Sequence, residues 1–226
     1  MTPTPTSFEV LPRDLSPYKS GNAGVDYVHR FESGRPGPHV LVNALTHGNE
    51  FCGMVAACHL LDHGVRPLHG TLTVSFANVA AYESFDPARP FDSRQITHNF
   101  NRIWSSDWLD GPLDSIELSR ARRMRPVVAA ADHILDIHST SQDVVPFWVY
   151  PQFDRNAAVA RALSQRPRTW SCRAGWVRVP RSSSTAGTAS RAMPARRWWP
   201  NAGSISSRPR PTWRWRWRWS SWRTSG

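Results

Sequence analysis

The chain lacks the features that mark membrane and secreted proteins. Its 226 residues contain no apolar run long enough to cross a bilayer, and Met1 to Lys19 lack the apolar stretch of a signal peptide. Three cysteines, Cys52, Cys58 and Cys172, do not make a disulfide framework. We therefore expect a cytoplasmic protein whose cysteines are reduced.

The last part of the chain lacks acidic residues altogether. All 17 aspartates and glutamates lie before Arg166, and residues 166–226 contain no Asp, Glu, Lys, Leu, Phe, Tyr or His. The same segment holds 14 of the 28 lysines and arginines, all as arginine, and nine of the 12 tryptophans. The formal charge is therefore +14 in this segment and −3 in residues 1–165. Such an abrupt change indicates that two kinds of sequence meet near residue 165.

The first 165 residues alternate strand and helix patterns. We expect irregular, extended chain over 1–24 and an α/β domain over 25–165, with a mostly parallel or mixed sheet and helices on both faces. One helix should end or kink at Pro126. The predicted strands are 25–31, 39–45, 70–77, 133–137 and 146–150, and the predicted helices are 49–63, 79–85, 113–125 and 153–163.

His47 and Glu50 stand at the junction of a predicted strand and a predicted helix. Two side chains three residues apart across such a turn can converge, and imidazole and carboxylate are both zinc ligands. H-x-x-E alone is common by chance, and the helix dipole also favours an acid near a helix N-terminus. Ligands in α/β sheets bind at the carboxyl ends of strands, which is where His47 is expected.

A second group, Asp136 and His138, lies at the end of another predicted strand. His138 could supply a third ligand, and three protein ligands with one open position are the pattern of catalytic zinc. Asp136 points to the same strand face as His138, so it could hold the imidazole from behind. The alternative is that His138 ends a strand and binds nothing.

A third group lies in the long loop expected over 86–107. Arg94 and Arg102, the latter beside Asn101, suit bidentate capture of a substrate carboxylate. The alternative is that these arginines lie on a solvated loop and bind nothing.

Taken in order, the three groups resemble the succinylglutamate desuccinylase/aspartoacylase family, relatives of the zinc carboxypeptidases. That family has H-G-N-E, then an arginine upstream of N-R, and then D-x-H. The resemblance extends over roughly residues 16–165. In this chain the motifs are His47-Gly48-Asn49-Glu50, Arg94 with Asn101-Arg102, and Asp136-Ile137-His138.

The resemblance implies a zinc-carboxypeptidase-like fold and a zinc-dependent hydrolase that cleaves the acyl group from an N-acyl amino acid with a zinc-activated water. One zinc ion per chain and a small-molecule substrate follow from it. Asn99 departs from the pattern, because the family often has an acidic residue before N-R. The implied residues are His47, Glu50 and His138 for zinc, and Arg94, Asn101 and Arg102 for the substrate's carboxylates.

The family also needs an acid/base glutamate well after the D-x-H histidine, and residues 166–226 contain none. If the gene is read one nucleotide earlier, a tryptophan codon followed by a CG-type arginine codon encodes an aliphatic residue and then an alanine. Such pairs of residues suit a buried helix. The shifted frame also allows a glutamate that straddles the codons of Pro200 and Asn201, in an E-x-G stretch like the family's motif. We hypothesise a frameshift near residues 162–168. The domain would then be incomplete, and the tail 166–226 disordered or misfolded as written.

Two other interpretations compete with an active enzyme. The chain could be a catalytically inactive remnant that binds zinc but lacks the acid/base glutamate. It could instead be a non-enzymatic protein whose Arg/Trp tail binds nucleic acid or an anionic membrane through charge and stacking. Neither of those partners is expected unless the tail is native sequence.

Overall fold

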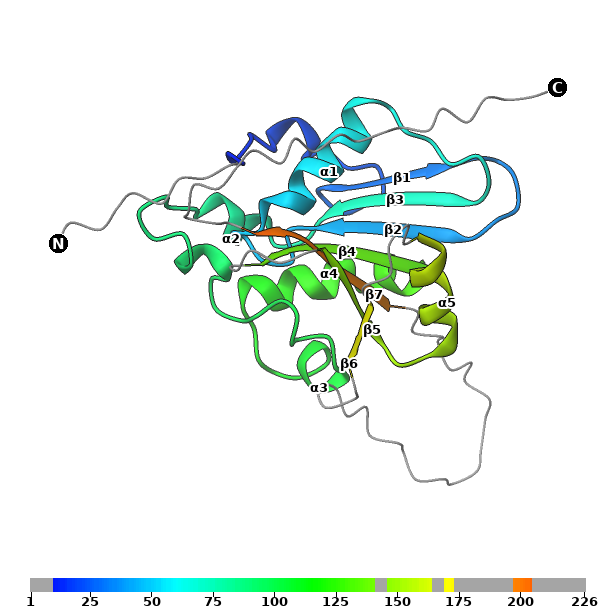
Figure 1. Ribbon diagram of the computed structural model, residues 1–226. Coiled ribbons are helices and arrows are strands. Elements are labelled where there is room, and N and C mark those ends of the chain that lie inside the picture. The colour runs from blue at the N-terminus through cyan, green and yellow to red at the C-terminus, as the bar shows by residue number, and fades with distance from the viewer. Residues whose placement is uncertain (1–9, 141–145, 164–168, 173–196, 205–226) are drawn as a thin grey trace, which may run out of the picture.

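The computed structural model shows a mixed sheet flanked by helices (Figure 1). The structure describes residues 10–140, 146–163, 169–172 and 197–204, and for the last two ranges only the course of the backbone. Across these ranges the sheet has the strand order β1-β3-β2-β4-β7-β5-β6. The strands are β1 (Val28–Glu32), β2 (His39–Ala44), β3 (Thr71–Phe76), β4 (His133–Thr140), β5 (Phe147–Pro151), β6 (Thr169–Cys172) and β7 (Arg197–Ser204).

Parallel pairing dominates the centre of the sheet. Strand β2 runs parallel to both β3 and β4, β4 is parallel to β7, and β5 is parallel to β6. Antiparallel pairs join β1 to β3 and β5 to β7. The predicted mixed α/β sheet is therefore confirmed. The helices are α1 (Phe51–Asp62), α2 (Val79–Glu83), α3 (Ser106–Leu109), α4 (Ile116–Ala130) and α5 (Asp154–Leu163), with 3-10 turns at Ser16–Tyr18 and Asp92–Arg94.

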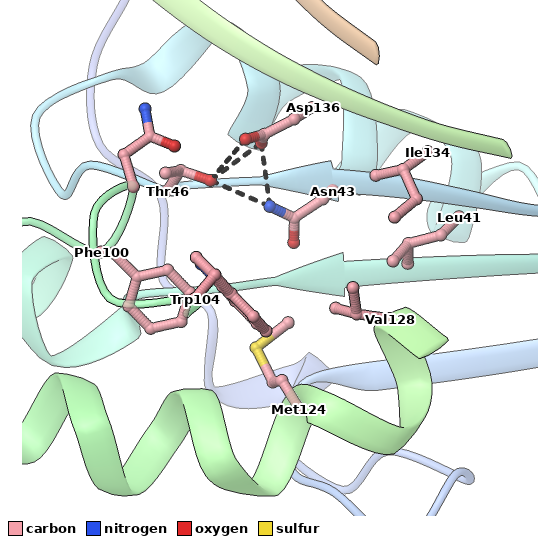
Figure 2. Close-up of a pocket in the computed structure, with 10 residues that line it drawn as sticks. Leu41, Asn43, Thr46, Phe100, Trp104, Met124, Val128, Ile134 and Asp136 are labelled. Atoms are coloured by element: carbon pink, nitrogen blue, oxygen red, sulfur yellow. Dashed lines mark hydrogen bonds between the residues drawn. The ribbon is translucent and has the colours of Figure 1, made fainter. Parts of the chain in front are cut away.

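Helices α1 and α4 cover opposite faces of the central strands. A Cβ placed on Gly53 of α1 would lie 3.2 Å from the Cβ of Ala44, so α1 packs on the Ala44 side of β2. Met124 and Val128 of α4 instead line a small cavity with Leu41 of the same strand (Figure 2). Neighbouring residues of a strand point to opposite faces, and Leu41 and Ala44 are an odd number of positions apart. Helices on both faces are thus confirmed.

Helix α4 runs past Pro126, so of the two predicted outcomes, an end or a kink at this residue, the end is wrong. An internal proline costs about 3 kcal/mol because it removes a helical hydrogen bond and clashes with the preceding turn. Leu118 and Met124, however, are 0% and 1% exposed, in a cluster with Phe100. Full burial of each such side chain stabilises the fold by about 1.5–3 kcal/mol, which together offsets the cost of the proline.

Two predicted segments lie partly outside the described residues. In the N-terminal segment residues 1–9 lie outside, while Leu15 is 3% exposed and packs into the core with Phe51 and Phe76. In the tail, strands β6 and β7 are described and the other residues from 173 onward lie outside. Across the described part of the chain, no helix combines the length and apolar character needed to cross a membrane.

Gly48 sits where the turn after β2 meets two other backbone segments. A Cβ at Gly48 would lie 2.3 Å from the carbonyl carbon of Ala81 and 2.4 Å from the carbonyl oxygen of Ser93. Neither backbone atom can rotate away as a flexible side chain could. Gly64, which follows α1, has φ +58°, and a Cβ at this position would meet no atom within 4 Å.

We predict that Gly48→Ala lowers the free energy of unfolding by on the order of 3 kcal/mol or more, because the turn must move to admit a methyl group. Gly64→Ala is the matched control, since its only cost is the left-handed backbone, about 1–2 kcal/mol. Urea denaturation of the two variants measures the difference. Equal losses would contradict a tight backbone contact at Gly48.

Candidate metal centre

The turn between β2 and α1 is held in an uncommon backbone conformation. Leu45, directly after β2, has φ 57°, a left-handed conformation that costs on the order of 1–2 kcal/mol for a residue with a Cβ. Its side chain is fully buried, and its carbonyl accepts a 2.8 Å hydrogen bond from the backbone of Asn78. These contacts fix the turn, so residues 46–50 leave the sheet at the carboxyl end of β2.

His47, Glu50 and His138 meet at this end of the sheet. The Glu50 carboxylate bridges the two rings, with Oε1 2.8 Å from His47 Nδ1 and Oε2 2.7 Å from His138 Nδ1. The three residues are 2%, 5% and 4% exposed. One donor atom from each lies within 4.8 Å of the others, which is a spacing that could hold a metal ion.

Glu50 is turned toward the histidines instead of capping α1. It occupies the N-cap position, yet its side chain makes no hydrogen bond to the helix amides. Its Oε2 accepts a 3.1 Å hydrogen bond from the backbone of Ser139, at the end of β4. The position of this carboxylate is therefore set by the two histidines and Ser139 and not by a capping hydrogen bond.

The donor set fits zinc. Two imidazoles and one carboxylate are a ligand set of catalytic zinc sites, and both histidines direct Nδ1 to the carboxylate. Both Nε2 atoms are contacted from outside the cluster, 2.9 Å from Asp136 Oδ2 for His138 and 3.2 Å from Asn99 Oδ1 for His47. Ligating histidines commonly donate their second nitrogen in this way, which leaves Nδ1 for the metal.

Charge within the cluster is strongly shifted. Burial acts to raise the pKa of Glu50, but hydrogen bonds from His138 and His47 bring that pKa far below its ordinary value. Burial acts to lower the pKa of His138, while the carboxylates of Asp136 and Glu50 raise it above its ordinary value. Glu50 is thus held as the anion that metal binding requires, and a proton on His138 must leave when a metal binds.

Asp136 is held by residues that the sequence reasoning did not single out. It accepts 2.8 Å hydrogen bonds from Asn43 Nδ2 and Thr46 Oγ1 (Figure 2). Asn43 Oδ1 in turn accepts a 2.6 Å hydrogen bond from Ser75. Asn43 is the one strongly polar side chain in the apolar run 40–45, and this break in the pattern was the signal available in the sequence.

The loop 86–107, which carries Arg94 and Arg102 and is called the arginine loop below, reaches the cluster through Arg94. Arg94 donates from Nη1 to Glu50 Oε1 at 2.8 Å, and its Nη2 lies 3.1 Å from His47 Nε2. The predicted substrate arginine therefore contacts two of the predicted metal ligands. Its side chain is 43% exposed, so it also reaches solvent.

Asn101 and Arg102 lie farther along the same loop. The Oδ1 atom of Asn101 is buried and, among the described residues, has no hydrogen-bond partner. Such an orphaned buried acceptor is uncommon in folded proteins. Arg102 is exposed and donates to the Asn101 carbonyl at 3.3 Å. Asn99, where the family often has an acid, accepts a 3.0 Å hydrogen bond from the Asn101 backbone.

Comparison with known proteins gives one family. The model of the succinylglutamate desuccinylase/aspartoacylase catalytic domain matches residues 36–172. A search among curated protein sequences gave no match.

Solved structures share the fold. A succinylglutamate desuccinylase from a Silicibacter species has 20% identity and a TM-score of 0.56, and covers 80% of this chain and 54% of its own. The product-bound ectoine utilization protein EutE from Ruegeria pomeroyi has 18% identity and a TM-score of 0.53, with the same coverage. Murine aminoacylase 3 has 21% identity and a TM-score of 0.50, covering 78% and 57%. The chain thus spans little more than half the length of these structures.

Proposed function

We propose that this chain, which belongs to the succinylglutamate desuccinylase/aspartoacylase catalytic domain family, carries the metal centre of a zinc-dependent hydrolase of N-acyl amino acids. Members of the family are deacylating hydrolases. The observation that carries the proposal is the buried cluster of His47, Glu50 and His138, with both Nδ1 atoms facing one carboxylate.

In this proposal His47, Glu50 and His138 hold one zinc ion through two nitrogens and one carboxylate oxygen. Asp136 fixes the proton of His138 on Nε2, 2.9 Å away, and so keeps Nδ1 available for the metal. A bound zinc ion supplies a Lewis acid that polarises a carbonyl and lowers the pKa of water to around 7.

Arg94 and Arg102 would bind the substrate's carboxylates. Once Nδ1 of His47 is engaged, its proton lies on Nε2 and pairs with Asn99 Oδ1, 3.2 Å away. A protonated Nε2 no longer accepts from Arg94, so the half-exposed guanidinium can turn to a substrate carboxylate. Asn101, next to Arg102 in the chain, is the third residue of this proposed carboxylate site.

The chain as written retains these residues and lacks an acid/base glutamate after Asp154. We propose that a frameshift near residues 162–168 removed it. The backbone register supports this, because Asn201 of β7 pairs with His138 of β4. The shifted frame allows a glutamate at the codons of Pro200 and Asn201, which is the strand position beside the metal centre.

We predict that the purified chain contains about one zinc ion per folded molecule. His138→Ala should lose most of this zinc, because it removes one of three proposed ligands. His59→Ala is the control, since His59 is an exposed histidine of α1. Elemental analysis of both variants checks the assignment, and equal zinc content in the two would refute it.

The substrate arginines are testable in a frame-restored enzyme. Arg102→Ala should raise KM and lower kcat/KM by about 2–5 kcal/mol of transition-state binding, the cost of leaving a bound carboxylate unpaired. Arg89→Ala is the matched control, because Arg89 lies in the same loop but pairs with Asp86 and Asp92. Steady-state kinetics with an N-acyl amino acid distinguishes them, and matching kinetics would exclude carboxylate binding by Arg102.

Turnover should depend on the reading frame. The chain as written should give no measurable release of amino acid, since a positioned general base alone contributes about 10²–10⁴-fold. A form read one nucleotide earlier from about residue 166 should be active. An assay of released amino acid on the two proteins decides whether turnover depends on the reading frame. Turnover by the chain as written would mean that the Arg/Trp tail is native sequence.

A further inference from the structure

Glu117, near the start of α4, is a fully buried carboxylate with no part in the metal cluster. It accepts hydrogen bonds from three consecutive backbone amides of the arginine loop. Ile96 donates to Oε1 at 2.6 Å, Thr97 to Oε1 at 3.2 Å, and His98 to Oε2 at 3.3 Å. Asn78 adds a longer contact of 3.5 Å from its side-chain amide.

The amides that Glu117 binds lie between the two loop residues that touch His47. Arg94 precedes them, with Nη2 3.1 Å from His47 Nε2. Asn99 follows them, with Oδ1 3.2 Å from the same nitrogen. The segment 94–99 is therefore attached to α4 in its middle, through residues 96–98, and to the metal cluster at both ends, through Arg94 and Asn99.

A second contact from α4 supports the attachment. Ser115, the N-cap residue of α4, lies with Oγ 2.8 Å from His98 Nδ1, and the same oxygen accepts from the Leu118 amide. Helix α4 is fixed in turn by Leu118 and Met124, which are buried against the sheet side of the domain. The position of the loop is thus set by a helix that is packed into the core.

The buried charge on Glu117 makes its hydrogen bonds to the loop necessary. Burial acts to raise the pKa of Glu117, but the amides of Ile96, Thr97 and His98 lower it below its ordinary value. A buried carboxylate is costly unless it is hydrogen-bonded, so loss of the loop contacts would leave an unsatisfied charge in the core. The loop is the source of most of those hydrogen bonds.

We propose that Glu117 is a positioning residue that clamps residues 96–98 to α4 and thereby holds Asn99 against His47 and keeps Arg94 within reach of the cluster. The inference rests on the proposed function in treating His47 as a metal ligand. Glu117 is not among the proposed metal ligands or substrate-binding residues, yet the positions of both groups depend on it. Zinc affinity and the rigidity of the loop should therefore respond together when the clamp is weakened.

Glu117→Gln in the full chain tests the clamp, because it keeps the side-chain shape but turns an NH₂ group toward backbone donors. Zinc affinity, measured by competition with a chelator, should fall about 10–100-fold, as for other residues that orient metal ligands. Amide exchange at 96–98 should quicken by about tenfold or more, since at least one hydrogen bond is lost. Glu117→Asp, which keeps the charge but shortens the reach, should give an intermediate result.

Tyr82→Phe is the matched control. It removes a hydroxyl that makes two 2.6 Å hydrogen bonds to the backbone of Arg13, a residue outside the loop. The change in the thermal unfolding temperature of each variant measures its general loss of stability. If Glu117→Gln changes zinc affinity and exchange at 96–98 no more than Tyr82→Phe does, the clamp is refuted.

Failure of the clamp and failure of the proposed function give different results. A wild-type chain that binds no zinc contradicts the metal centre, and exchange at 96–98 then decides the clamp alone. If Glu117→Gln does not fold, Glu117→Asp carries the same comparison. Unchanged exchange and zinc affinity in that variant would overturn the proposal, and a joint loss supports it.

Discussion

Glu50 places a buried carboxylate between two imidazole rings, and this is possible only if the ends of β2 and β4 lie side by side in one register. That register pairs Asn43 with Asp136, so His138 stands just beyond the paired segment, beside the turn that carries His47. A slip of one residue would turn His138 to the opposite face of the sheet. The cluster therefore depends on strand pairing more than on local sequence.

Polar residues in the sheet interior hold that register in place. Asn43, Thr46 and Asp136 are 8%, 3% and 5% exposed, and each is costly to bury without partners. They satisfy one another, with Asp136 accepting from both of the others and from His138. An apolar sheet would pack as well, but it could not fix which nitrogen of His138 carries the proton. We infer that these residues serve the site at some cost to stability.

The parts of the site predicted from the sequence are those encoded by local pattern. The strand that ends before His47 is an apolar run and the helix that follows Glu50 has helical spacing, so their junction could be placed. His138 was found by the same reasoning at the end of an apolar run. The continuation of α4 through Pro126 was missed because the decisive term, burial of Leu118 and Met124, comes from distant parts of the chain.

Contacts between distant residues were not predictable in the same way. Arg94 was expected at a substrate carboxylate, yet it also lies against Glu50, 44 positions away. Asn99 looked like a departure from the family pattern, and its contact with His47 spans 52 positions. Glu117 stands in a stretch rich in arginine that is typical of a solvated helix, and only the folded loop makes it a buried acceptor.

Strand β7 brings the unusual tail sequence into the middle of this arrangement. It lies between β4 and β5, and Pro200 pairs with Trp148 of β5. Proline has no backbone N–H, so it is found essentially at sheet edges and bulges, and the register with β4 is indeed irregular between His138 and Thr140. A residue with an N–H at this position would remove the conflict. The proposed shift of reading frame allows a glutamate at the codons of Pro200 and Asn201, which would put a residue with an N–H and a carboxylate in the strand beside His138. The proposed change of frame would therefore account for two separate features at once: the proline inside the sheet and the missing acid/base glutamate of the site.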